Sequence, residues 1–88
     1  MEIQRRIIWD ESALNELVSA LQWISQSSVQ GAEVVEDGVL NAIVEASHNP
    51  ERHPPDKYKR NNPGNFRAFE IHNYRVSYCY TNNEIQNS

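Results

Sequence analysis

Apolar residues alternate with polar ones near the N-terminus, and their spacing then lengthens to three and four. Ile3, Arg5, Ile7 and Trp9 share one side of an extended chain, so residues 3–9 are predicted to form a strand. Asp10 is a suitable N-cap for a helix over residues 11–26. The apolar stripe of that helix is Leu14, Leu17, Val18, Leu21 and Ile24.

A second amphipathic helix is predicted over residues 31–47. Its stripe is Ala32, Val35, Val39, Ala42, Ile43 and Ala46. Gly38 interrupts this helix at a cost of about 1 kcal/mol relative to alanine, and a close approach between the two helices would account for it. Asn49-Pro50 ends the helix, because a residue before proline avoids the helical region. The short link predicts an antiparallel helical hairpin.

The last third of the chain predicts a loop and then a β-hairpin. Residues 51–65 are rich in proline, asparagine and charge, and they are expected to form an ordered loop. Strands are predicted over 66–71 and 74–81, with His72-Asn73 as a two-residue turn. Residues 84–86 resemble the start of a further strand that is not completed.

This order of elements predicts an α+β fold in one domain, residues 1–88, with the helical hairpin packed on one face of an antiparallel sheet. The expected core is Leu14, Leu17, Leu21, Val35, Val39, Phe69, Ile71 and Val76. An uncompleted strand at 84–86 would leave backbone groups unpaired, so a partner is expected to dock beside this edge and the first helix.

The turn also assigns each arginine of the hairpin to a face. Arg67 lies opposite Tyr78, at the rim of the face that meets the helices, where its stem can pack and its head can reach solvent. Arg75 lies on the open face opposite Glu70, its expected ion-pair partner. A structural ion pair is the more common role for such an arginine, and catalysis by Arg75 is the alternative.

Composition limits the partners that the chain can bind. Eight Lys and Arg against twelve Asp and Glu give a net charge of -4, which argues against direct nucleic-acid binding. Lys57, Lys59 and Arg60 form the one basic cluster, which is either solvated or a contact with an acidic partner or DNA. Trp23 lies on the side of its helix away from the stripe, which indicates an interface or packing against the loop.

Residues of metal-ligand type do not suggest a metal or cofactor. His48 and His53 lie near Glu51 and Asp56 without regular ligand spacing, so they are predicted to be solvated loop residues. Cys79 is predicted to be a half-buried structural thiol, and a single cysteine excludes an internal disulfide. With no secretory signal or membrane-spanning run, a soluble cytoplasmic protein is expected.

Four motifs resemble one known family. They are W-D-x-S-A-L-x-E-L (9–17), Trp23-Ile24, Asn49-Pro50 and F-R-A-F-E-I-x-N-Y-R-V-x-Y (66–78). In this order they are similar to the RelE/ParE toxins of bacterial type II toxin–antitoxin systems. The resemblance implies the same fold and a small growth inhibitor that an antitoxin wraps and neutralises. RelE-like members cleave messenger RNA on the ribosome, and ParE-like members poison DNA gyrase.

The ParE-like branch fits these residues better. RelE-like ribonucleases carry several cations on the open sheet face and a Tyr or His near the C-terminus. Here Arg75 matches the family's arginine in the Y-R-V element, while the neighbouring positions Phe66, Ala68, Ser77 and Cys79 add no cation. The residues expected to bind a partner, the antitoxin or a target such as gyrase, are Trp23, Lys57, Lys59, Arg60, Arg67 and Arg75. A RelE-like ribonuclease, or a truncated member acting only as a binding module, are the alternatives.

Overall fold

The computed structural model of the chain describes residues 4–87 and has the predicted order of elements. These are strand β1 (Arg6–Trp9), helices α1 (Glu11–Ser27) and α2 (Val29–His48), a 3-10 turn (Pro50–Arg52), and strands β2 (Phe66–Ile71), β3 (Tyr74–Tyr80) and β4 (Glu84–Asn87). The α+β prediction is confirmed. Strand β1 is shorter than expected, and Ile3 of its predicted range lies outside the described residues.

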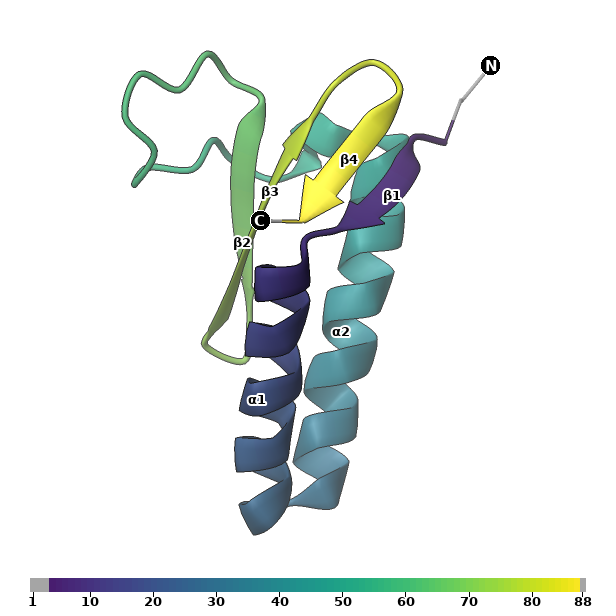
Figure 1. Cartoon of the computed structure of the whole chain (residues 1–88), viewed down its shortest axis with the longest axis vertical. Helices are drawn as coiled ribbons and strands as arrows, with labels where there is room; N and C mark the ends of the chain where they lie inside the picture. The colour runs from purple at the N-terminus through teal and green to yellow at the C-terminus, as the bar shows by residue number, and fades with distance from the viewer. Residues whose placement is uncertain (1–3, 88) are drawn as a thin grey trace.

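The four strands form one mixed sheet in the order β1-β4-β3-β2. Strand β4 pairs in parallel with β1 and antiparallel with β3, so it lies inside the sheet between them (Figure 1). The prediction of a purely antiparallel sheet is therefore wrong, and so is the prediction that residues 84–86 remain an uncompleted strand. Docking of a partner on unpaired backbone at β4 is also wrong, because both edges of β4 are already paired.

The two helices form the predicted antiparallel hairpin, joined by one residue (Figure 1). Ser28 ends α1 with a hydrogen bond from its backbone N–H to the Ile24 carbonyl. The Ser28 hydroxyl also accepts a hydrogen bond from Gly31 N at 2.9 Å and so caps α2. The predicted cap of α1 is confirmed, since Asp10 Oδ2 accepts a hydrogen bond from Ala13 N at 3.1 Å.

The core lies between the helical hairpin and the sheet. Its fully or nearly fully buried members are Leu17, Val35, Val39, Ile43, Ala46, Phe69, Val76, Tyr78 and Ile85. Leu21 and Ile71 pack against it half-buried, but Leu14 is 42 % exposed, so its placement in the core is wrong. Ala13 and Leu17 set the inward direction of α1, and the 3.6-residue turn carries Leu14 to its flank.

Gly38 is explained by a contact with the sheet. A Cβ atom at this position would lie 2.8 Å from Cγ2 of Ile71, the last residue of β2. Real Cβ contacts are essentially never this short, so a larger residue would require Ile71 to move. The close approach is therefore between α2 and β2, and the predicted approach between the two helices is wrong.

Candidate functional site

The β2–β3 hairpin has the predicted turn and register. His72 and Asn73 have φ angles of 47° and 71°, as a two-residue turn of this type requires. Glu70 lies opposite Arg75 and Arg67 lies opposite Tyr78, as expected. Because side chains alternate along a strand, Arg75 and Tyr78 project from opposite faces of the sheet.

The long loop before β2 is ordered around Asn62. The Oδ1 atom of Asn62 accepts hydrogen bonds from Gly64 N at 2.8 Å and Phe66 N at 3.2 Å. Its Nδ2 atom donates to the Phe66 carbonyl at 2.7 Å. Gly64 has a φ of 110°, in the left-handed region that glycine tolerates best. The predicted ordered loop is confirmed.

Part of this loop runs along the outer edge of β2. Asp56 N donates to the Phe66 carbonyl at 2.8 Å, and Ala68 N donates to the Pro54 carbonyl at 3.3 Å. Pro55 forms an antiparallel bridge with Arg67. The segment 54–56 therefore covers the edge of β2 and brings Asp56 beside the hairpin.

Arg67 fastens the loop to the sheet. Its Nε atom donates to the Gly64 carbonyl at 2.8 Å, and Nη1 donates to the His53 carbonyl at 3.0 Å. Both bonds hold loop backbone that would otherwise need water. These two hydrogen bonds give Arg67 a structural role, and its role in partner binding stays a prediction.

Arg75 is ion-paired with Asp56. Arg75 Nη2 lies 2.5 Å from Asp56 Oδ1, and the two side chains are 33 % and 12 % exposed. Asp56 Oδ1 also accepts a hydrogen bond from Tyr58 N at 2.9 Å. The predicted Glu70–Arg75 ion pair is wrong in its partner, because the loop places Asp56 closer to the guanidinium than the cross-strand carboxylate.

Aromatic rings hold the cations around Arg75. The Arg75 guanidinium carbon lies 4.7 Å from the centre of the Tyr58 ring, and Lys57 Nζ lies 5.2 Å from the same centre. Lys59 Nζ lies 4.4 Å from the centre of the Phe66 ring. Such contacts restrict the positions of otherwise flexible cations. With exposed Arg60, these residues form what we call the basic patch: Lys57, Tyr58, Lys59, Arg60, Phe66 and Arg75.

Trp23 lies apart from the basic patch. Its side chain is 75 % exposed on α1, so packing against the loop does not cover it. The C-terminal end of α1 reaches the end of the molecule opposite the loop (Figure 1). One partner would have to contact two separate surfaces to bind both, and the interface role of Trp23 stays a prediction.

His53 and Tyr78 lie on the face of the sheet that meets the helices. The His53 ring stacks on Phe69 with 4.6 Å between ring centres, and its Nε2 atom is buried without a hydrogen-bond partner among the described residues. The prediction that His53 is a solvated loop residue is therefore wrong. Tyr78 is fully buried and donates its hydroxyl to the Pro50 carbonyl at 2.7 Å. Burial raises the pKa of Tyr78 to about 12.

The environment of His53 predicts a loss of stability in mild acid. Burial, and next the Arg52 charge, lower the pKa of His53 below its ordinary 6.5, although Glu45 opposes this. The unfolded chain therefore binds the proton first, and the stability due to neutral His53 is lost as pH falls from about 6.5 through the lower folded pKa. Urea unfolding above and below this window should show a smaller decline for His53→Phe, which keeps a stacked ring. The exposed control His48→Gln should decline like the unsubstituted chain, and an unaltered decline in His53→Phe would contradict the assignment.

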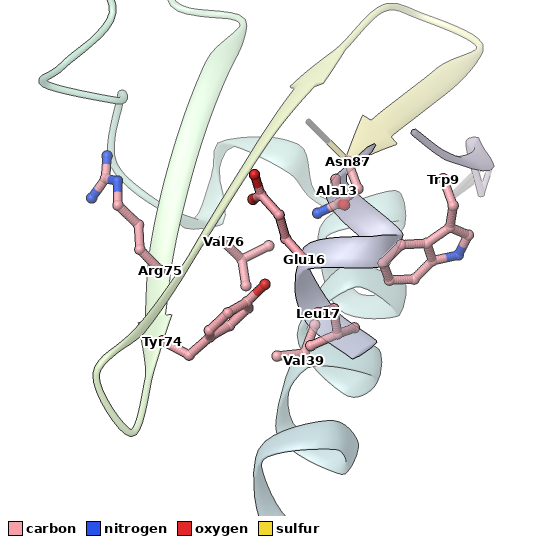
Figure 2. Close-up of a pocket in the computed structure, with 9 residues that line it drawn as sticks. All are labelled: Trp9, Ala13, Glu16, Leu17, Val39, Tyr74, Arg75, Val76 and Asn87. Carbon is pink, nitrogen blue, oxygen red and sulfur yellow. The ribbon is translucent and has the colours of Figure 1, made fainter. Parts of the chain in front are cut away.

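A small cavity separates α1 from β3. It is lined by Trp9, Ala13, Glu16, Leu17, Val39, Tyr74, Arg75, Val76 and Asn87, and its volume of about 20 Å³ is close to that of one water. Burial, and next the charge of Glu16, raise the pKa of Tyr74. Figure 2 shows the Tyr74 hydroxyl directed toward Glu16, whereas the Arg75 side chain points away from both. The cavity is too small for an organic substrate.

Other candidate chemistry is limited within residues 4–87. No three His, Cys, Asp or Glu side chains in this part of the chain are grouped to hold a metal ion. Cys79 is a free thiol, half-buried on β3, as expected. Neither α1 nor α2 is long and apolar enough to cross a membrane.

Sequence reasoning missed two residues that organise the basic patch, Asp56 and Tyr58. A signal for Asp56 was present, because an Asp in a turn can accept a hydrogen bond from the backbone N–H two residues on, and Asp56 lies in a proline-rich loop. Here that bond reaches Tyr58 N and fixes the direction of the loop. The contact between Asp56 and Arg75 left no signal, because it depends on how the loop folds back along β2.

The fold and the patch together define a class of protein. The chain is a small α+β domain in which a helical hairpin covers a four-stranded mixed sheet, and a basic loop lies beside the β2–β3 hairpin. The family model described as "ParE toxin of type II toxin-antitoxin system, parDE" matches residues 7–86. The chain therefore belongs to this toxin family, and membership implies an antitoxin partner. A comparison with curated proteins gives no match.

Proposed function

We propose that this toxin is a ParE-like growth inhibitor that acts by binding a protein target such as DNA gyrase. The observation that carries the proposal is the environment of Arg75, which is held by Asp56 and by the exposed ring of Tyr58. Arg and Tyr are among the residue types that most often carry the binding energy of protein–protein interfaces. The antitoxin would prevent this contact, and a gyrase target would require the toxin to act in the cytoplasm.

The same environment argues against the RelE-like ribonuclease. A guanidinium donates hydrogen bonds but accepts none, so Arg75 could bind a phosphate but could not remove a proton from a nucleophile. Tyr78 and His53 have the side-chain types that acid–base catalysis uses, but both lie on the helix-facing side of the sheet. With its hydroxyl bonded to Pro50 and its pKa raised to about 12 by burial, Tyr78 is poorly placed to exchange protons.

Expression in bacteria without the antitoxin tests the proposal. Growth should stop, and the purified toxin should inhibit supercoiling by gyrase or increase the amount of cleaved DNA that gyrase holds. Arg75→Gln should weaken inhibition of gyrase by about tenfold or more, the loss expected for one charged contact. Arg6→Gln is the matched control. Arg6 lies on β1, the edge strand opposite β2, and its ion pair with Glu84 is exposed.

Primer extension on messenger RNA from the same cells separates the two activities. Messenger RNA should show no new cleavage sites when growth stops. New, translation-dependent cleavage sites that disappear in Arg75→Ala would overturn the gyrase proposal and restore the ribonuclease. Normal growth and unaffected gyrase would favour a binding module without toxic activity.

A further inference from the structure

A groove of about 350 Å³ lies beside the basic patch, between the loop and the β2–β3 hairpin. It is lined by Pro54, Pro55, Lys57, Ala68, Phe69, Glu70 and Arg75. The two exposed prolines supply apolar surface, and Lys57 and Arg75 supply positive charge. Ala68, expected on an open face, is only 5 % exposed, so the side chains and segment around it enclose this part of the hairpin.

Asp56 behaves as an internal ligand of Arg75. Its Oδ1 atom contacts Arg75 Nη2 and also accepts from Tyr58 N, so one carboxylate oxygen serves both groups. The Asp56 side chain is 12 % exposed, whereas one third of the Arg75 side chain faces solvent. The Arg75 guanidinium thus binds a carboxylate through one nitrogen and remains accessible to solvent. It lies beside the ring of Tyr58, a residue that is 72 % exposed.

We propose that this groove docks a short acidic segment of a protein partner. Carboxylates of the segment bind Arg75 and Lys57, and its apolar side chains lie against the two prolines. In the free toxin Asp56 occupies the carboxylate position on Arg75 and weakens docking by competition. This inference rests on the proposed function in one respect, because both require the partner to be a protein.

Charge complementarity favours an acidic segment. Lys57, Lys59, Arg60 and Arg75 are four of the eight Lys and Arg in a chain whose net charge is -4. A short acidic peptide would contact the positive charge of the basic patch without reaching the rest of the surface, which is negative overall. A nucleic acid extends its charge well beyond so small a patch, toward a surface that is negative overall, and its affinity depends on how many phosphates are neutralised.

A binding experiment with charge variants tests the proposal. The probe is a short fluorescein-labelled peptide of alternating Glu and Leu, followed by fluorescence anisotropy at low and at physiological ionic strength. Asp56→Asn keeps an oxygen that can accept from Tyr58 N but removes the competing charge, so it should bind the peptide about five- to tenfold more tightly. Arg75→Gln should bind about tenfold more weakly or worse. Arg6→Gln, far from the groove, should bind like the unsubstituted toxin.

Glu70→Gln tests the docking site itself if Asp56→Asn disturbs the loop. Glu70 lines the groove and is exposed, so neutralising it should tighten binding about two- to threefold without breaking a hydrogen bond of the loop. Circular dichroism melts identify any variant that is no longer folded. No tightening in folded Asp56→Asn would overturn the internal-ligand assignment, and no tightening in folded Glu70→Gln would overturn the docking of carboxylates in this groove.

The remaining outcomes concern the occupant. Tighter binding of a single-stranded DNA oligonucleotide of matched length would overturn the assignment to an acidic protein segment. Absence of saturable peptide binding in every variant would overturn the docking site itself. Growth arrest and gyrase inhibition are measured separately, so failure of the docking site and failure of the proposed function are distinguishable.

Discussion

Replacing Ile85 with alanine is expected to lower the free energy of unfolding by about 2 to 5 kcal/mol. Ile85 is fully buried, and it lies on β4 opposite Ile7 of β1 and Tyr80 of β3. The substitution leaves a cavity at the point where β1 and β4, the first and last strands, pair in the sheet. Because small domains are stable by only about 5 to 15 kcal/mol, this is a large share of the total.

Gln86→Ala is the matched control for Ile85→Ala. Gln86 is the next residue on β4 and is exposed, so its loss should change the free energy of unfolding by about 0.5 kcal/mol or less. Urea or guanidinium unfolding of both variants at equal protein concentration measures the difference. Equal, small effects in the two variants would contradict a buried, central β4.

The elements that the sequence predicts well depend on contacts between near neighbours. Spacings of three and four residues define α1 and α2, and Asp10 marks the start of α1. The turn at His72-Asn73 fixes the register of β2 and β3 through the positive φ of both residues. In each case one local preference, for a helix cap or for a turn, decides the geometry.

The central position of β4 could not be predicted in the same way. Glu84–Asn87 is a four-residue strand, and its parallel partner Arg6–Trp9 comes from the other end of the chain. No turn links the two, so neither register nor direction leaves a local signal. Residues 84–86 were therefore predicted to be an uncompleted strand, although both edges of β4 are paired in the folded molecule.

The sequence predicted which charged residues belong to the candidate site, but it did not predict the contact between Asp56 and Arg75. Lys57, Lys59 and Arg60 are visible in the sequence as a basic cluster, and Arg75 is visible through the hairpin register. Asp56 reaches Arg75 only because the loop turns back along β2, through backbone hydrogen bonds to Phe66 and Ala68. Pairings set by loop backbone are independent of side-chain pattern, so the expected partner was the cross-strand Glu70.

Leu14 shows a finer limit of periodicity. A helical stripe identifies the residues near one face, but the depth of burial depends on which neighbours cover each flank. Helix α1 buries Ala13 and Leu17, whereas Leu14 and Val18 are 42 % and 45 % exposed on one flank. The apolar pattern alone assigned Leu14 and Leu17 the same role.

The two leucines therefore provide a matched test of the packing of α1. Leu17→Ala should lower the free energy of unfolding by about 2 to 5 kcal/mol, because the side chain is 6 % exposed within the core. Leu14→Ala removes the same atoms from the same helix, and alanine favours helix at least as well as leucine. Its cost should be about 1 kcal/mol or less, since much of the Leu14 side chain already contacts solvent. Denaturant unfolding of both variants measures the difference, and a loss below about 0.5 kcal/mol for Leu17→Ala, or equal losses at the two positions, would show that α1 does not pack on the core through Leu17.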